Sequence, residues 1–225
     1  MTEMIRKALV SFAACVALIG AQGGAWSQET ARLTVPLDGT KNAVAETNLG
    51  NLVADAVRAA TTADFAFIQA SALQPVTVPP GDVTVEALRA MLVFPDEPIS
   101  VVRLDAARIQ DALERSLALL PHPNKGFLHV SRLRLSFDQT ASPGARLRGL
   151  VAVQTNAALA QDKTYRVAMP RSLARGALGY FRVFNSAPSE HTEVTLAQAL
   201  TAFAVATKPL APRIEGRIKP VQLEQ

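Results

Sequence analysis

Apolar side chains recur every three or four residues in four stretches of the chain, a pattern that predicts amphipathic helices. The predicted helices cover residues 48–60, 85–92, 106–120 and 195–207. In the first, one face carries Leu49, Leu52, Val53, Ala56 and Val57. A side-chain oxygen that could accept a free backbone N–H stands before each of the first three helices, at Thr47 or Asn48, at Thr84 and at Asp105.

Short apolar runs between the helices predict strands at residues 64–68, 99–104, 127–137, 146–153 and 165–169. The apolar face changes phase within 127–137, and a bulge near Ser131 and Arg132 would reconcile the two halves. Residues 28–45 are predicted to be an irregular lead-in, and residues 69–82 a loop with extended pieces. Because helices and strands do not alternate strictly, the predicted fold class is α+β, a single domain with a mixed β-sheet and flanking helices.

The first 27 residues have the order of parts found in a secretory signal peptide. Arg6 and Lys7 precede an apolar stretch at residues 8–19, and Ala25-Trp26-Ser27 fits a cleavage site between small residues. The stretch is too short to span a bilayer, so we expect cleavage after about Ser27 and no stable membrane insertion afterwards. The expected location is periplasmic or secreted, with residues 28–225 as the mature domain. An uncleaved membrane anchor and a lipoprotein modified at Cys15 are the alternatives.

Charge and cysteine content narrow the range of partners. The formal net charge is +4, and the basic residues are scattered rather than clustered, which argues against a nucleic-acid partner. The single cysteine, Cys15, lies in the predicted signal peptide, so the mature chain is expected to form no disulfide.

No residue pattern for catalysis is found in the mature part of the sequence. The three histidines, His122, His129 and His191, are not spaced as ligands with one another, and His129 is expected to be packed or surface-exposed rather than a metal ligand. The segment Gly176-Ala-Leu-Gly179 lacks the lysine and serine of a phosphate-binding loop. We therefore expect no catalytic residues, no metal and no cofactor in this chain.

Seven segments, in order, carry a family resemblance. They are Glu46-Thr-Asn-Leu-Gly-Asn-Leu-Val-Ala-Asp-Ala56, Thr62-Ala-Asp-Phe-Ala66, Gly81-Asp-Val-Thr84, Leu113-Glu-Arg-Ser116, Gly126-Phe-Leu-His-Val-Ser131, Asp162-Lys-Thr-Tyr-Arg-Val167 and Arg213-Ile-Glu-Gly-Arg-Ile218. Together they resemble the 5'-nucleotidase C-terminal domain family over about residues 35–218. The resemblance implies a domain that binds a nucleotide beside a separate dimetal phosphoesterase domain. Only a short polar segment precedes the match, so we expect no such domain in this chain.

The resemblance also assigns a substrate pocket, and this sequence departs from it. Family members read Asn-x-Gly-Gly-Ile-Arg where this chain reads Gln69-Ala-Ser-Ala-Leu-Gln74, so Gln74 replaces an arginine that contacts phosphate. Of two aromatic rings that hold the base, the first falls at Ile99 and the second is kept as Tyr180. Leu178 replaces an aspartate, and Arg132 replaces a glycine and is expected to crowd the same region. The remnant substrate-binding positions are Gln69, Ser71, Gln74, Ile99, Arg132, Gly176, Leu178 and Tyr180.

These substitutions predict an exported, stand-alone domain that is non-catalytic and has an eroded nucleotide pocket. Two alternatives stay open. The chain could be a specificity subunit that works in trans with a separate metallophosphatase, or it could bind a more apolar small molecule between Leu73, Ile99, Leu178 and Tyr180. Arg171, Arg175 and Arg182 form either a solvated rim or an anion-attracting edge. Direct nucleotidase activity, the family's label, would need metal ligands that we do not find in this sequence.

Overall fold

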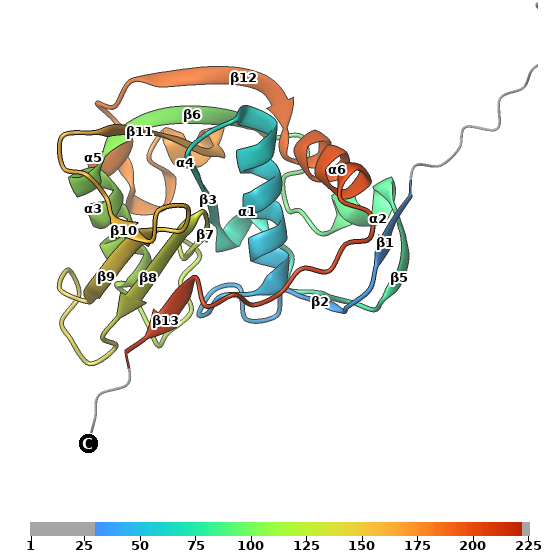
Figure 1. Ribbon diagram of the computed structural model, residues 1–225, viewed down its shortest axis with the longest axis horizontal. Helices are drawn as coiled ribbons and strands as arrows, with labels where there is room; N and C mark the ends of the chain where they lie inside the picture. The colour runs from blue at the N-terminus through green and yellow to red at the C-terminus, as the bar shows by residue number, and fades with distance from the viewer. Residues whose placement is uncertain (1–29, 222–225) are drawn as a thin grey trace, which may run out of the picture.

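The computed structural model describes residues 30–221, so the predicted signal peptide at residues 1–27 lies outside the described part. A five-stranded mixed sheet with the order β12-β6-β11-β3-β7 forms its centre (Figure 1). The bounds of these strands are β3 Phe65–Gln69, β6 Pro98–Asp105, β7 Leu128–Ser131, β11 Thr164–Pro170 and β12 Ser189–Thr195. Only β3 and β11 run parallel to each other. The predicted α+β fold with a mixed sheet is confirmed.

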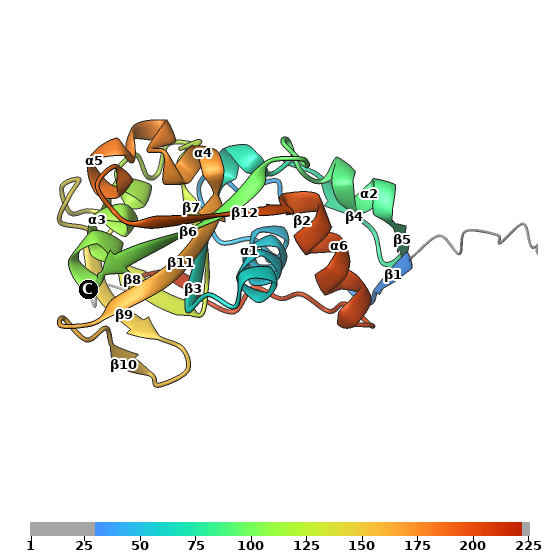
Figure 2. The same cartoon turned by 90° about the horizontal axis from the view of Figure 1, so that it is seen from above.

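Each face of the central sheet is covered by a separate hydrophobic core, because side chains alternate along a strand. In β3, Ala66 and Ile68 belong to one core, and Phe65 and Phe67 belong to the other. Helices α1 (Asn48–Thr61), α2 (Val85–Ala90) and α6 (Leu196–Ala206) cover the first face. Helices α3 (Ala106–Leu117), α4 (Arg171–Ala174) and α5 (Phe181–Phe184) cover the second (Figure 2).

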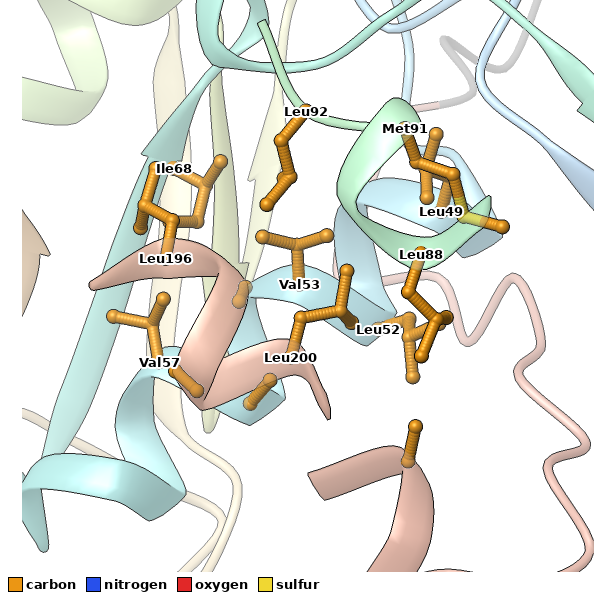
Figure 3. Packing of buried hydrophobic residues seen from close by; sticks show 14 of the residues in the cluster. Leu49, Leu52, Val53, Val57, Ile68, Leu88, Met91, Leu92, Leu196 and Leu200 are labelled. Atoms are coloured by element: carbon orange, nitrogen blue, oxygen red, sulfur yellow. The ribbon is translucent and has the colours of Figure 1, made fainter. Parts of the chain in front are cut away.

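The first core shows why the predicted helices form. Leu52, Val53 and Val57 of α1 lie in one cluster with Leu196 and Leu200 of α6, and Leu49 is drawn near Leu88 and Met91 in the same cluster (Figure 3). The apolar positions of α1 and α6 are therefore buried in this core, as the three- and four-residue spacing predicts. The predicted caps are confirmed: Thr47 Oγ1 accepts from Gly50 N at 3.1 Å, and Asp105 Oδ1 accepts from Arg108 N at 2.8 Å.

Smaller sheets complete the domain. A four-stranded sheet has the order β10-β9-β8-β13, with bounds β8 Leu133–Phe137, β9 Leu147–Ala152, β10 Ala157–Ala158 and β13 Ile218–Pro220. There are also two small two-stranded sheets among the described residues. One pairs β1 (Thr30–Leu33) with β5 (Gly81–Thr84), and the other pairs β2 (Leu37–Asp38) with β4 (Thr77–Val78). Two 3₁₀ turns, η1 (Ala70–Ala72) and η2 (Ala177–Gly179), lie in loops beside the central sheet. Among the described residues, no helix is long and apolar enough to cross a membrane.

The predicted single strand at residues 127–137 is wrong. The chain forms β7 in the central sheet, turns at Arg132 with a φ of 63°, and continues as β8 in the four-stranded sheet. The phase change in the sequence therefore records a change of sheet rather than a bulge. A left-handed φ is unusual for a residue with a side chain, and this conformation redirects the strand.

Several short strands were not predicted. The lead-in at residues 28–45 contains β1 and β2, and the loop at residues 69–82 contains η1, β4 and the start of β5. Strand β12 also escapes detection, since its side chains are mostly exposed and polar. Period-2 hydrophobicity appears only where one face of a strand is buried.

The first and last of the seven resembling segments meet in space. The Glu46 carboxylate accepts hydrogen bonds from Glu215 N at 2.7 Å and Ile218 N at 3.2 Å, and from Asn51 Nδ2 at 2.7 Å. Asn51 Nδ2 also donates to the carbonyl oxygen of Arg213 at 2.9 Å. These contacts fasten the segment before β13 across the start of α1, which Figure 1 shows. Glu46 is buried, and its hydrogen bonds replace those it would make to water.

Candidate functional site

Most of the sequence-predicted site residues lie near one edge of the central sheet. The parallel strands β3 and β11 both end there, and β6 and β7 begin there because they run the other way. Gln69 pairs with Leu128, and Pro170 pairs with Ile99. Loops at the carboxyl ends of parallel strands are a common location for ligand sites.

The β3 end of this edge is held firmly by the backbone. Ala70 N donates to the carbonyl oxygen of Phe127 at 2.8 Å, and Ser71 N donates to that of Lys125 at 3.0 Å. The Gln69 side chain is buried, and its Oε1 has no hydrogen-bond partner among the described residues. Gln74 lies beyond η1, where its N–H donates to the carbonyl oxygen of Met91 at 2.9 Å. Ser71 and Gln74 are both only partly exposed.

The segment from Gly176 to Tyr180 is a tight turn built on left-handed residues. Gly176, Leu178 and Gly179 have φ values of 89°, 59° and 84°. A Cβ on Gly176 would lie 2.3 Å from Phe181 Cα, so the close approach of the chain requires glycine there. Arg115 Nη2 donates to the carbonyl oxygen of Leu178 at 2.8 Å and fixes the turn from α3.

Tyr180 lies in the core rather than on a surface. Its side chain is fully buried, and its hydroxyl donates to the carbonyl oxygen of Gly126 at 2.6 Å. The ring stacks on Phe184 with centroids 5.4 Å apart, and the Arg115 guanidinium lies 5.9 Å from the ring centroid. Burial raises the pKa of the Tyr180 hydroxyl well above its ordinary value. Ile99 is likewise fully buried, so neither position offers an exposed face.

Arg132 does not belong to this edge. Its neighbour Ser131 pairs with Ala66, near the start of β3, whereas the other predicted positions cluster at the end of β3. The expectation that Arg132 crowds the remnant pocket is therefore wrong, because the turn into β8 places it at the opposite edge of the sheet.

The three arginines near the turn differ in their hydrogen bonding and solvent exposure. Arg171 Nη2 donates to the carbonyl oxygen of Thr192 at 2.8 Å and lies 3.9 Å from a carboxylate oxygen of Glu193. Arg175 and Arg182 are exposed, as expected for a solvated rim.

A shallow apolar hollow at the same edge was not predicted. It has a volume of about 520 Å³ and is lined by Val93, Phe94, Pro95, Asp96, Glu97 and Ser172. Phe94 is 54% exposed, which is high for a phenylalanine. Glu97 Oε1 accepts from Ser172 N at 2.7 Å and joins the β6 side of the hollow to α4. The run Val-Phe-Pro at residues 93–95, directly after a helix, is the sequence signal that could have indicated it.

The histidines are accounted for by packing and hydrogen bonding. His129 is fully buried, and His191 Nδ1 lies 3.0 Å from Ser100 Oγ, which joins β12 to β6. His122 is exposed in the loop after α3. Within residues 30–221, no group of three or more His, Cys, Asp or Glu side chains is placed to hold a metal ion.

Comparisons with known sequences agree with the fold. The family described as "5'-nucleotidase, C-terminal domain" matches residues 28–186. The trifunctional nucleotide phosphoesterase YfkN of Bacillus subtilis is 30% identical over 202 residues, which cover 84% of this chain and 14% of that protein. A snake venom 5'-nucleotidase of Macrovipera lebetinus is 26% identical over 215 residues, which cover 86% of this chain and 52% of that protein. The chain thus spans about half or less of the length of these relatives.

Solved structures share the same architecture. A 5'-nucleotidase precursor from Thermus thermophilus aligns with a TM-score of 0.80 at 24% identity, over 99% of this chain and 44% of that one. The NAD nucleotidase of Haemophilus influenzae aligns with a TM-score of 0.76 at 17% identity, over 86% of this chain and 38% of that one. The family match at residues 28–186 covers well over half of the chain. This protein therefore belongs to the 5'-nucleotidase C-terminal domain family.

Proposed function

We propose that this chain is an exported, non-hydrolytic member of its family, which keeps the domain's frame as a binding or interaction module and no longer seats a nucleotide. The observation that carries the proposal is the setting of Tyr180. Its ring is covered by Phe184 and its hydroxyl is bound to Gly126, so stacking on a base would require both contacts to be broken. Opening a buried aromatic pair in this way costs packing as well as a hydrogen bond.

The phosphate end of the remnant site supports the same proposal. Gln74 stands where the resemblance expects an arginine, and an amide cannot supply the bidentate cation that binds a phosphate strongly. Ser71 and Ala72 fill the positions of the glycine pair, and Ala72 is fully buried in η1. Side chains therefore occupy space through which a ligand would approach the backbone.

Phosphate release and nucleoside binding test this function directly. The purified mature chain, incubated with AMP and with Mn²⁺, Mg²⁺ or Zn²⁺, is expected to release no more phosphate than buffer alone. Adenosine, which has a base but no phosphate, is expected to leave the melting temperature unchanged, because a ligand that binds the folded state raises it. A full-length 5'-nucleotidase serves as the positive control. Metal-dependent phosphate release that EDTA stops, or a rise in melting temperature with adenosine, would contradict the proposal.

Export has its own test, based on Trp26, the only tryptophan in the sequence. Cleavage after about Ser27 removes it, so protein recovered from the periplasm or medium is expected to show tyrosine emission only. Mass spectrometry of the same material is expected to place the new N-terminus near Gln28. Tryptophan emission from the exported protein, or recovery of the full-length chain in the cytoplasmic fraction alone, would count against this part of the proposal.

A second function, the binding of a small apolar molecule, is favoured by the hollow beside Phe94. Its lining is mainly apolar, and Phe94 and Val93 are 54% and 37% exposed. Phe94→Ser should then lower the affinity for an apolar probe such as 1-anilinonaphthalene-8-sulfonate, whereas Leu119→Ser, at an exposed apolar position outside the hollow, should not. Equal probe binding by both variants would remove this candidate. The third possibility, a specificity subunit, predicts that the chain changes the rate of a separate metallophosphatase when the two are mixed.

A further inference from the structure

A second cavity lies at the opposite edge of the central sheet from the candidate site. It has a volume of about 380 Å³ and is lined by Asp55, Arg58, Arg132, Val153, Phe203, Glu215 and Arg217. A smaller cavity of about 170 Å³ adjoins it and shares Asp55, Phe203, Glu215 and Arg217. We call the first, larger cavity the arginine cleft. Its walls come from α1, the turn between β7 and β8, the end of β9, α6 and the segment before β13 (Figure 1).

One of the three arginines is fully used in holding the fold. Arg217 Nη1 and Nη2 donate to the two carboxylate oxygens of Asp55 at 2.9 and 2.7 Å, and Nε donates to Glu215 Oε2 at 3.0 Å. Nη1 also donates to the carbonyl oxygen of Val130 at 2.8 Å, and Ser131 Oγ donates to Asp55 at 2.6 Å. The acidic side chains of the cleft are therefore already paired with Arg217, whose side chain is only 8% exposed.

The other two arginines have no such partners. The guanidinium groups of Arg58 and Arg132 make no hydrogen bond or ion pair with any residue in the range 30–221. Arg58 Nε is buried and unpaired, and an unsatisfied buried donor costs free energy. Burial lowers the pKa of the Arg58 guanidinium, and the nearby charge of Arg132 adds to this shift, whereas the Asp55 carboxylate opposes it. Arg58 and the exposed Arg132 thus face one cavity without an acidic partner of their own among the described residues, and an anion bound there could pair with the partly buried Arg58 and reduce the repulsion between the two cations.

The rest of the lining is apolar. Phe203 of α6 is partly exposed, and Val153, just after β9, is 38% exposed. The volume is within the range of cavities that hold small organic ligands. A ligand suited to these walls has an anionic group at one end and an apolar body at the other.

We propose that the arginine cleft binds a small organic anion, with a phosphate or carboxylate group held between Arg58 and Arg132 and an apolar body against Phe203 and Val153. Guanidinium groups suit such oxyanions, because their planar N–H donors pair with two oxygens at once. The site is separate from the remnant nucleotide pocket and takes the anionic group rather than a base. Its occupancy therefore does not depend on the function proposed above.

Arg132 offers a variant that removes one cation without harming the fold. Its φ of 63° is a conformation that glycine adopts without strain. Arg132→Gly should therefore fold at least as stably as the parent while it loses the guanidinium. Arg134→Ala, at an exposed arginine of β8 outside the cleft lining, is the matched control.

Calorimetric titration at low ionic strength tests the proposal, with phenyl phosphate, phenylacetate and inorganic phosphate as probes. We expect one site per chain that prefers a probe with a ring over inorganic phosphate, and the tighter of the two aromatic probes identifies the anionic group. Arg132→Gly is expected to weaken binding at least about tenfold, and Arg58→Met with Arg132→Gly to abolish it, whereas Arg134→Ala leaves it unchanged. The proposal is overturned if none of the probes binds, or if the Arg132→Gly variant binds them as tightly as the parent.

Discussion

Replacing Gly50 with alanine is expected to lower the free energy of unfolding by about 3 kcal/mol or more. Gly50 lies in the first turn of α1 and packs against the ring of His129 on β7. A Cβ at this position would lie 2.1 Å from His129 Nδ1 and 2.3 Å from Cγ, so one of the two elements must move. The ring cannot shift without loss, since its Nε2 donates to the carbonyl oxygen of Asn42 at 3.0 Å within the core. The higher helix propensity of alanine offsets only about 1 kcal/mol of this cost.

Urea denaturation of a double-mutant cycle separates this clash from a general effect on α1. In a His129→Ala background the ring is absent, and Gly50→Ala is then expected to be neutral or slightly stabilising. If Gly50→Ala costs the same amount of free energy with and without the His129 ring, the close contact is not the cause.

Acidification from about pH 6.5 to about pH 4 is expected to cost on the order of 3 kcal/mol of stability through His129 alone. Burial lowers the pKa of His129 from 6.5 to about 4, against smaller opposing effects of the Asn42 hydrogen bond and Glu46. The folded chain therefore keeps the ring neutral where the unfolded chain already binds a proton. The contribution of His129 is complete above pH 6.5, falls as the pH is lowered to about 4, and changes no further below that value.

The pKa of His129 is lowered because of the surroundings of its Nδ1 atom. This atom is buried, has no hydrogen-bond partner within residues 30–221 and faces the Gly50 backbone, so a proton on it would lack an acceptor. Denaturation curves from pH 8 to pH 4 check the expectation, with His129→Asn as the control that cannot titrate. The difference in unfolding free energy between the two proteins should shrink toward acid. A difference that stays constant with pH would show that His129 does not cause the loss.

The helices were predictable from the sequence because each is marked by local signals, namely a capping residue and a regular spacing of apolar side chains. Asp105 precedes α3, and the apolar side chains of α1 keep their spacing regardless of what they pack on. No local signal in the sequence indicates which strands pair with each other. The same apolar alternation at residues 127–137 fits one bulged strand or two strands in different sheets, and only the φ of Arg132 decides between them. Strand β12 was missed because its exposed side chains show no periodic burial.

The sequence could indicate which segments lie together at this edge of the sheet, but not how their side chains are arranged. The family resemblance assigned the region of Gln69 and the turn around Leu178 to one pocket, and the structure places both at one edge of the sheet, where Gly126 lies between them. The direction in which the Tyr180 ring points could not be read from the sequence, because it depends on Phe184 and on the carbonyl oxygen of Gly126. The arginine cleft was missed for a similar reason, since Arg58 and Arg132 are far apart in the chain and meet only through the packing of α1 on β7.

The carboxylate of Glu46 has a consequence for the order in which the chain can assemble. It binds the backbone at Glu215, 169 residues later, and Asp55 likewise receives Arg217 only from the end of the sequence. In a polypeptide that emerges N-terminus first, both acidic groups lack these partners until residues 215–218 are free. Long-range closures of this kind delay folding, because the intervening chain must be ordered before the contact forms. The domain is therefore expected to complete its structure only after the segment at residues 213–218 has joined the rest of the fold.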